Sequence, residues 1–169
     1  NEAVHVQKLS ENSNSGIRGL IVSIRPEEDN EFNSWFEKTI EMNVAGYRRI
    51  LHIMPDETSV TNTFINNIKK IGKAEKPFDI CYLPTQLSIA YDFAKNCDET
   101  NLVLNHCGVP SIAAGEIDQW GKDIKRLSEL PNVTCKLSGL MAYCAPGTSS
   151  QETIQPYVDI VLDCFGANR

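Results

Sequence analysis

The residues best suited to chemistry stand together where an apolar run ends. Residues 102–104 are apolar, Asn105 and His106 follow, and a glycine and a proline then break the chain. A buried parallel strand that ends in polar side chains and a turn presents those side chains at its C-terminal end. We therefore predict His106 as the main functional residue, with a hydrogen-bonded core histidine as the alternative.

Other predicted strands also end in polar side chains. Arg48 lies in the strand predicted over residues 45–53, and Tyr82 lies near the end of the one over 78–83. In the strand over 133–138, Lys136 and Ser138 share one face by the period-two rule. The carboxyl ends of parallel strands meet at one edge of the sheet, so these groups predict a single site.

Each of these residues also has a purely structural interpretation. Arg48 and the neighbouring Arg49 could form surface ion pairs. Lys136 could close a structural salt bridge, since a buried lysine needs a partner or loses its charge. His52 follows the same strand as Arg48, and we expect it to be a surface histidine.

Strands and helices are expected to alternate along the chain. Period-two or continuous apolar runs predict six strands, over residues 3–7, 17–24, 45–53, 78–83, 102–106 and 133–138. Apolar residues at helical spacing predict five helices, over residues 31–43, 60–71, 87–97, 117–130 and 149–165. Asp29 or Asn30 is the expected N-cap of the first helix, and Ser149 with Glu152 a capping box for the last.

This alternation predicts an α/β fold with right-handed crossovers and a parallel sheet. Both a doubly wound open sheet and a barrel fit the order of elements. The sequence contains neither Gly-x-Gly-x-x-Gly nor a Gly-Lys-Ser/Thr phosphate loop, which removes the usual reason to prefer a nucleotide-binding open sheet.

Composition restricts the class of partner. The net charge of −6 argues against nucleic acid and anionic membranes, which call for a basic face. No apolar run approaches the roughly 18 residues of a membrane span. The six cysteines form no Cys-x-x-Cys pair, and three lie in or directly after predicted strands, so we expect a cytoplasmic protein with reduced thiols rather than a secreted disulfide-linked one.

Several motifs together resemble the amidohydrolase-related family, over most of the chain from residue 16. These motifs are Asn-Leu-Val-Leu-Asn-His-Cys-Gly-Val-Pro at 101–110, Trp120, Leu-Pro-Asn-Val-Thr-Cys-Lys-Leu-Ser-Gly at 130–139, Gly-Tyr-Arg at 46–48 and Phe-Gly-Ala-Asn-Arg at 165–169. The most similar branch is that of the lactonases, such as the pyrone-dicarboxylate and fucono-lactone hydrolases.

The resemblance implies a (β/α)8 TIM-like barrel with its site at the C-terminal strand ends. It implies hydrolysis of a lactone, or a related ester or amide bond, in a small substrate, and the match of Arg48 to a family arginine implies a substrate carboxylate. The resemblance matches His106 and Lys136, which we predict as catalytic residues, and Arg48, which we predict to bind substrate. Tyr82, Asn105 and Ser138 are predicted to bind substrate as well, because they lie at strand ends. His106 would either ligate a divalent metal, zinc or manganese, or polarise the substrate carbonyl, since some lactonases work without a metal. A homo-oligomer is a further expectation.

The sequence also departs from the family pattern. It contains no His-x-His, and it stops at Arg169, where the family's strand with a general-base aspartate would begin. We therefore expect one barrel domain over residues 1–169 that lacks the first and last strands, as the central portion of a longer hydrolase chain. The alternatives are a metal-dependent decarboxylase of the same superfamily and, if the chain is complete, a non-catalytic binding domain.

Overall fold

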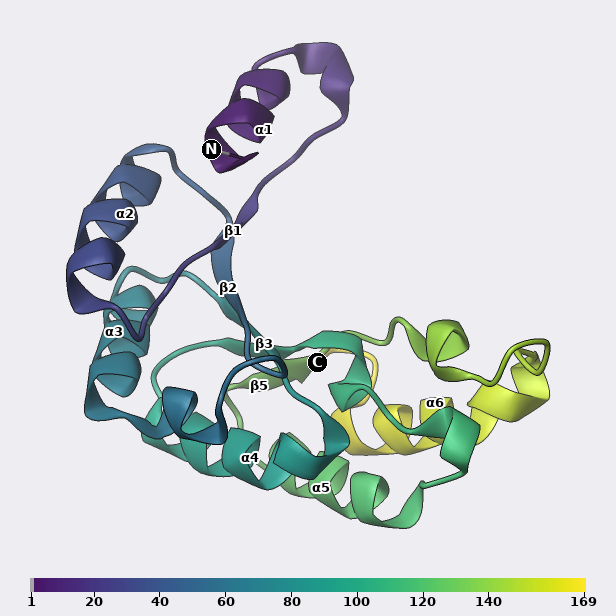
Figure 1. The fold of residues 1–169 in the computed structure, drawn as a ribbon. Coiled ribbons are helices and arrows are strands. Elements are labelled where there is room, and N and C mark those ends of the chain that lie inside the picture. Colours follow the sequence, from purple (N-terminus) through teal and green to yellow (C-terminus); the bar gives the residue numbers. More distant parts are fainter. Residues whose placement is uncertain (1) are drawn as a thin grey trace.

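A five-stranded parallel sheet forms the centre of the molecule (Figure 1). The computed structural model describes residues 2–169. The strands are β1 (Ile21–Ser23), β2 (Gly46–Ile50), β3 (Phe78–Cys81), β4 (Leu102–Leu104) and β5 (Val133–Cys135). Their spatial order is β1-β2-β3-β4-β5, so each strand lies beside its predecessor in sequence. A doubly wound sheet reverses its strand order at a switch point, whereas a barrel wall keeps it; the observed order is that of a barrel wall.

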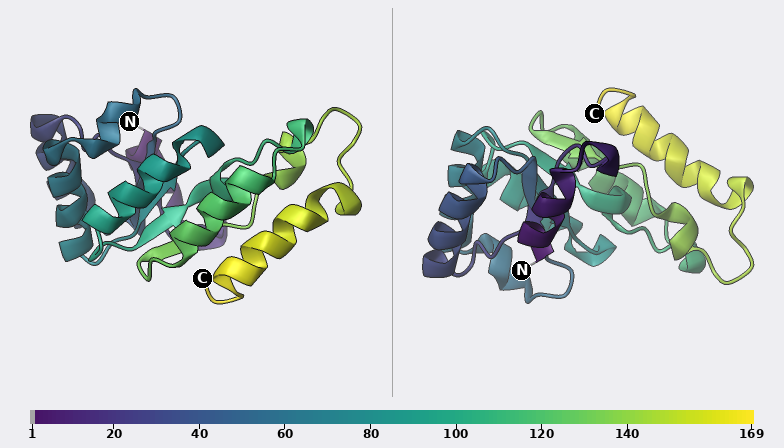
Figure 2. Two further views of the ribbon diagram at one scale, coloured as in Figure 1. Left: turned by 90° about the horizontal axis from the view of Figure 1, so that it is seen from below. Right: turned by 90° about the horizontal axis from the view of Figure 1, so that it is seen from above.

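Six α-helices accompany the sheet. They are α1 (Glu2–Ser10), α2 (Asp29–Glu41), α3 (Asn62–Lys73), α4 (Leu87–Asn96), α5 (Asp118–Ser128) and α6 (Gln151–Phe165). Short 3-10 helices occupy Ser13–Ser15, Asp56–Val60, Pro84–Gln86, Asn105–Gly108, Ile112–Ala114 and Leu140–Tyr143. Helices α2 to α6 follow the outer side of the curved sheet, and α4, α5 and α6 run side by side in two further views (Figure 2).

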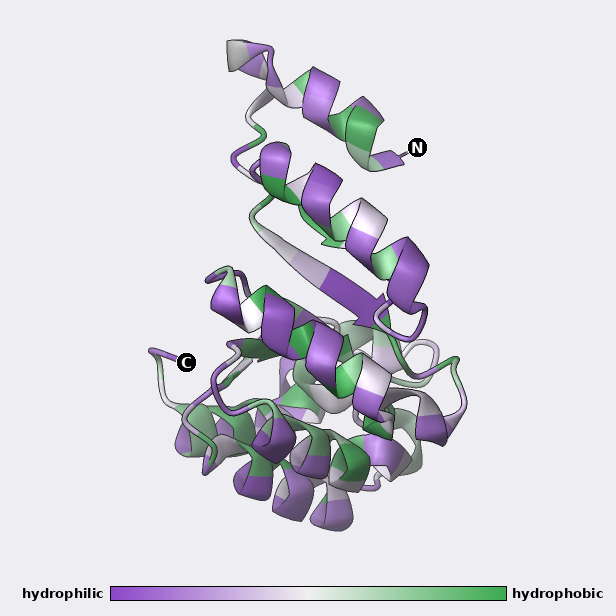
Figure 3. Ribbon diagram, turned by 90° about the vertical axis from the view of Figure 1, so that its left-hand side faces the viewer, coloured by the Kyte–Doolittle hydropathy of each residue, from purple (hydrophilic) through white to green (hydrophobic). Residues whose placement is uncertain are grey.

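The core lies between the sheet and these helices. In α3, Phe64, Ile68 and Ile71 recur at helical spacing and are fully buried. The Phe64 ring makes edge contacts with Phe78 of β3 and Phe93 of α4. Apolar residues of the helices face the sheet and hydrophilic residues face outward (Figure 3). Each such side chain contributes roughly 1.5–3 kcal/mol by leaving water, so this layer fixes the sheet on which the polar residues stand.

The structure contains five of the six predicted strands and all five predicted helices. The predicted strand over residues 3–7 is wrong, because these residues lie in α1. Ala3 and Val6 are three residues apart and both line one cavity, as one side of a helix allows. A five-residue run fits period two and period 3.6 equally well, and this run has no neighbouring strand to pair with.

Two predicted helix caps are shifted by one residue. Glu28, rather than Asp29 or Asn30, is the N-cap of α2, and it makes no capping hydrogen bond. Ser150, rather than Ser149, caps α6, where its hydroxyl accepts a hydrogen bond from the Thr153 amide.

Candidate functional site

The inner face of the sheet, opposite the helices, carries a row of aligned residues. The strand register places Ser23, Arg48, Asp79, Val103 and Thr134 beside one another, one from each strand. Side chains at aligned positions of parallel strands point to the same face. The residues that follow this row, among them His106 and Lys136, therefore lie at the same C-terminal edge of the sheet.

His106 is held in a strained turn after β4. Its backbone is left-handed, with φ 53° and ψ 39°, and Cys107 has φ 55°. Such a conformation is costly for a residue with a side chain and persists only where the surroundings enforce it. The Cys107 amide donates to the Lys136 carbonyl at 3.2 Å, and the Trp120 indole donates to the Cys107 carbonyl at 2.8 Å. The turn is thus fixed by β5 on one side and by α5 on the other.

The His106 side chain faces the segment after β5. Its Nδ1 lies 2.9 Å from the Ser138 hydroxyl oxygen. Gly139 has φ +79°, and a Cβ there would lie 3.2 Å from His106 Nδ1 and 3.2 Å from the Tyr143 hydroxyl. A glycine therefore both makes the turn possible and leaves room for the imidazole.

Lys136 reaches across the inner face to Asp79. Its ammonium forms an ion pair with the Asp79 carboxylate, whose side chain is only 6% exposed, whereas the lysine side chain is 44% exposed. The salt-bridge interpretation of Lys136 thus describes its contact correctly. The lysine ammonium compensates the charge of the buried Asp79 carboxylate and, because Lys136 is exposed, it also remains accessible at the open side of the site.

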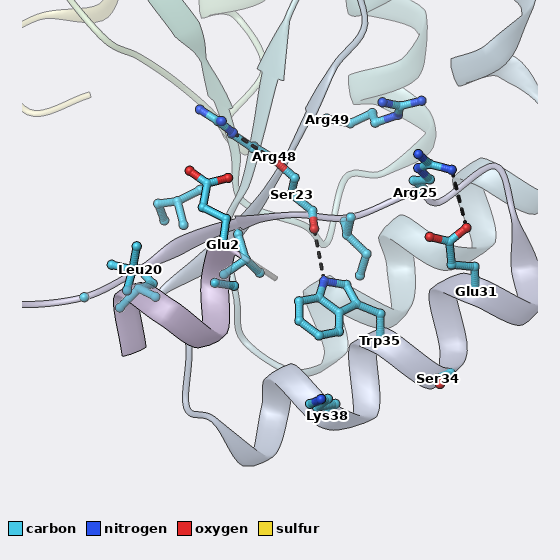
Figure 4. A pocket seen from close by; sticks show the side chains of 16 residues that line it. Glu2, Leu20, Ser23, Arg25, Glu31, Ser34, Trp35, Lys38, Arg48 and Arg49 are labelled. Atoms are coloured by element: carbon cyan, nitrogen blue, oxygen red, sulfur yellow. Dashed lines mark hydrogen bonds and ion pairs between the residues drawn. The ribbon is translucent and has the colours of Figure 1, made fainter. Parts of the chain in front are cut away.

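The two adjacent arginines take different directions. Arg49 forms an ion pair with Glu27 in which both side chains are largely covered, and its Nε donates to Glu27 Oε2 at 3.3 Å. Arg48 donates from Nε to the Ser23 hydroxyl at 3.3 Å (Figure 4). Among residues 2–169, no carboxylate forms an ion pair with Arg48, so most of its guanidinium donors are free for a ligand.

Two of the predicted substrate-binding residues lie differently. Tyr82 is buried in the core, beside Ser59, and burial raises the pKa of its hydroxyl. Asp79 and Cys81 point to the inner face of the sheet, so Tyr82, the next residue, points to the helix side. The structure therefore does not bring Tyr82 to His106. Asn105 is partly exposed, and its buried side-chain oxygen has no hydrogen-bond partner within the described part of the chain.

The structure adds three residues that sequence reasoning missed as members of the site. His52 Nδ1 lies 3.1 Å from Cys81 Sγ, so His52 is engaged with the sheet instead of being an isolated surface histidine. Tyr143 lies near the Gly139 turn, and burial raises the pKa of its hydroxyl. The sequence held one signal for the His52–Cys81 pair, because Cys81 lies two residues after Asp79 and so shares its face of the strand. It held no signal for Tyr143, whose position depends on the loop after β5.

The residues described here do not make a metal centre on their own. Over residues 2–169, no three side chains of His, Cys, Asp or Glu lie close enough to hold a metal ion. The Nδ1 atom of His106 is occupied by Ser138, and Asp79 is occupied by Lys136. A structural or catalytic zinc needs at least three protein ligands, so His106 does not by itself fit a metal site.

A cavity of about 1000 Å³ lies elsewhere, along the free edge of β1. Residues from α1, β1, α2 and β2 line it, and Figure 4 shows Trp35 and Lys38 of α2 on one side and Glu2 of α1 on another. Arg48 lines this cavity, whereas His106, Lys136 and Ser138 do not. We therefore place the candidate site at the C-terminal edge and not in this cavity. No helix within residues 2–169 is long and apolar enough to cross a membrane.

Comparisons with known proteins agree with this architecture. The sequence profile of the amidohydrolase family matches residues 6–169. A zinc-bound amidohydrolase from Burkholderia multivorans superposes with a TM-score of 0.86 at 23% identity, over 98% of this chain and 60% of that one. A putative 2-pyrone-4,6-dicarboxylic acid hydrolase from Pseudomonas putida superposes with a TM-score of 0.73 at 16% identity, over 99% and 60%.

Among curated proteins, the L-fucono-1,5-lactonase of Burkholderia ambifaria is 36% identical over 92 residues, which cover 54% of this chain and 31% of the lactonase. The chain spans between 31% and 50% of the length of the curated relatives it matches. The profile match over nearly all residues shows that this chain belongs to the amidohydrolase family. Its parallel sheet is part of the barrel of that family.

Proposed function

We propose that the protein containing this chain hydrolyses a lactone, or a related ester bond, in a small carboxylated substrate. The observation that carries the proposal is the set of cationic and hydrogen-bonding groups at the C-terminal edge of an otherwise acidic chain. Arg48 and Lys136 contribute two positive charges there, and Asp79 contributes one negative charge. This edge therefore favours an anionic ligand although the net charge of the chain is −6.

Each residue has a distinct role in this proposal. Arg48 binds the substrate carboxylate, because its planar guanidinium can pair with both oxygens. His106 polarises the reacting carbonyl by hydrogen bonding, and Ser138 holds the imidazole in place through Nδ1. Lys136 stabilises negative charge on the substrate oxygen while it remains paired with Asp79. Asn105 offers an amide at the same edge.

Activation of water is assigned to a residue outside this sequence. Asp79 is held by Lys136, so it is not a free general base. The family resemblance assigns that role to an aspartate in a motif that residues 1–169 do not contain. In our proposal the described residues therefore bind, orient and polarise the substrate.

Names of related proteins support the substrate class. One relative is an L-fucono-1,5-lactonase, and one structural neighbour is a putative 2-pyrone-4,6-dicarboxylic acid hydrolase. The zinc in another neighbour supports a divalent metal in the whole protein. Because Ser138 takes His106 Nδ1, only Nε2 could hold such a metal; it would then replace the hydrogen bond to the carbonyl, and the other ligands would come from outside the described residues. Free thiols at all six cysteines support a reducing compartment such as the cytoplasm. Homo-oligomerisation stays a prediction.

The test is a hydrolysis assay of the intact protein with a panel of carboxylated and neutral lactones. We expect turnover of carboxylated lactones and little of neutral ones. Parallel assays with a chelator and with added zinc or manganese determine whether a metal is needed. Release of carbon dioxide without lactone hydrolysis would replace this proposal with a decarboxylase, and ligand binding without any turnover would replace it with a binding protein.

A further inference from the structure

His52 and Cys81 are joined at the C-terminal edge through both their backbones and their side chains. The His52 amide donates to the Cys81 carbonyl at 2.9 Å, and His52 Nδ1 lies 3.1 Å from Cys81 Sγ. Cys81 is 7% exposed, while His52 is partly exposed. The backbone contact fixes the main chain of His52, and the side-chain contact orients its imidazole ring.

A protonated thiol can donate to His52 Nδ1 or accept from it, depending on the imidazole tautomer, and we take the thiol as the donor. Burial raises the pKa of Cys81; Arg48 lowers it and Asp79 raises it further. The thiol thus keeps its proton near neutral pH and can donate S–H to His52 Nδ1. A neutral imidazole that accepts at Nδ1 carries its own proton on Nε2.

The pair belongs to the same edge as the candidate site. Cys81 lies two residues after Asp79 and aligns with Ile50 of β2, so its side chain is on the inner face. The two imidazole nitrogens lie on different sides of the ring, so Nε2 is directed away from Cys81. Within residues 2–169, no side chain is hydrogen-bonded to His52 Nε2. Arg48 acts electrostatically on the Cys81 thiol that contacts His52. An N–H donor thus remains available on the side of the sheet that also carries Arg48.

We propose that His52 is a further substrate-binding residue, whose Nε2–H donates to an anionic oxygen of the ligand held by Arg48. Cys81 is its positioning residue, because the thiol selects the imidazole tautomer and fixes the ring. The ligand class is a small molecule with at least one carboxylate. This inference rests on the proposed function for the identity of the ligand and on the His52–Cys81 geometry for its mechanism.

The first test measures equilibrium binding of citrate to the intact protein by calorimetry, which needs no turnover. We expect His52→Leu to weaken binding about tenfold, the effect of losing one hydrogen bond to a charged group. His52→Gln should restore affinity to within about threefold of wild type, since its side-chain N–H can replace Nε2–H. His5→Leu, at an exposed histidine of α1, is the control and should bind as wild type does. Unchanged binding by His52→Leu would overturn the inference.

The second test measures the tautomer directly by the ¹⁵N shifts of the His52 ring. We expect Nδ1 without a proton in the wild type and a mixture of tautomers in Cys81→Ala. A protonated Nδ1 in the wild type would overturn the positioning role. If citrate binding depends on His52 but no lactone is hydrolysed, the proposed function fails and this inference stands. If lactones are hydrolysed while His52→Leu changes neither citrate binding nor KM, the inference alone fails.

Discussion

Neighbouring residues of β3 face two different environments. Phe78 and Ile80 are fully buried, and the Phe78 ring contacts Phe64 of α3. Asp79 and Cys81 point to the inner face, where they contact Lys136 and His52. The helix side thus consists of apolar contacts that stabilise the fold, while the inner side consists of polar pairs between different strand ends. Along these four consecutive residues, alternation directs Phe78 and Ile80 into the core and directs Asp79 and Cys81 to the face that carries the candidate site.

The largest expected effect is on activity at the inner side. Replacing His106 with alanine in the intact protein should lower kcat/KM for a carboxylated lactone about 100-fold or more, the usual loss when a polarising hydrogen-bond donor is removed. The thermal midpoint should change little, because the side chain is only partly buried. His5→Ala on α1 is the matched control. Activity within about threefold of wild type would remove His106 from the mechanism.

The opposite behaviour is expected on the helix side of the same strand. Ile80→Ala should lower the free energy of unfolding by about 2–4 kcal/mol, because it leaves a cavity among fully buried side chains. At a temperature where the variant is folded, KM should stay within about twofold of wild type. Denaturant unfolding and steady-state kinetics measure the two effects. A large rise in KM with little loss of stability would contradict the division between the two sides.

An intermediate effect is expected where stability and chemistry overlap. Lys136→Met should lower the free energy of unfolding by about 1–3 kcal/mol, because it leaves the buried Asp79 carboxylate without its cation. The double variant Asp79→Asn with Lys136→Met removes the unpaired charge and should recover part of that stability, but not the activity. Equal stability of the single and double variants would show that the ion pair has no structural role.

The smallest effect concerns substrate affinity. Arg48→Lys should raise KM for carboxylated lactones about tenfold, since an ammonium cannot pair with both carboxylate oxygens. The KM for neutral lactones should not change, and neither should stability, because Arg48 is exposed and, within residues 2–169, its side chain makes one hydrogen bond, to Ser23. Steady-state kinetics with matched neutral and carboxylated substrates measures this. An equal rise in KM for both substrates would assign Arg48 a structural role instead.

Local patterns predicted the positions of the strands that carry the site. The polar residues after β4 identified His106, and alternation in the strand that contains Lys136 placed its side chain on a buried or inner face with Ser138. Alternation should also have separated Tyr82 from Asp79, because residues three apart in a strand face opposite sides. The prediction of Tyr82 as a substrate-binding residue followed its place at the strand end and ignored this rule.

Other features depend on contacts that the sequence alone does not reveal. The partner of Lys136 is 57 residues away in Asp79, and the partner of His52 is 29 residues away in Cys81. Such pairs require the strand order and register to be known first. The helix over residues 2–10 was missed for a different reason, since five residues are too few to distinguish the two periods.

The most direct test of the site's location is a crystal structure of the intact protein with a bound carboxylated lactone or citrate. We expect a ligand carboxylate within hydrogen-bond distance of the Arg48 guanidinium and another ligand oxygen beside His106. A ligand bound in the cavity beside Trp35 and Lys38, with His106 free of contact, would contradict a site at the C-terminal edge.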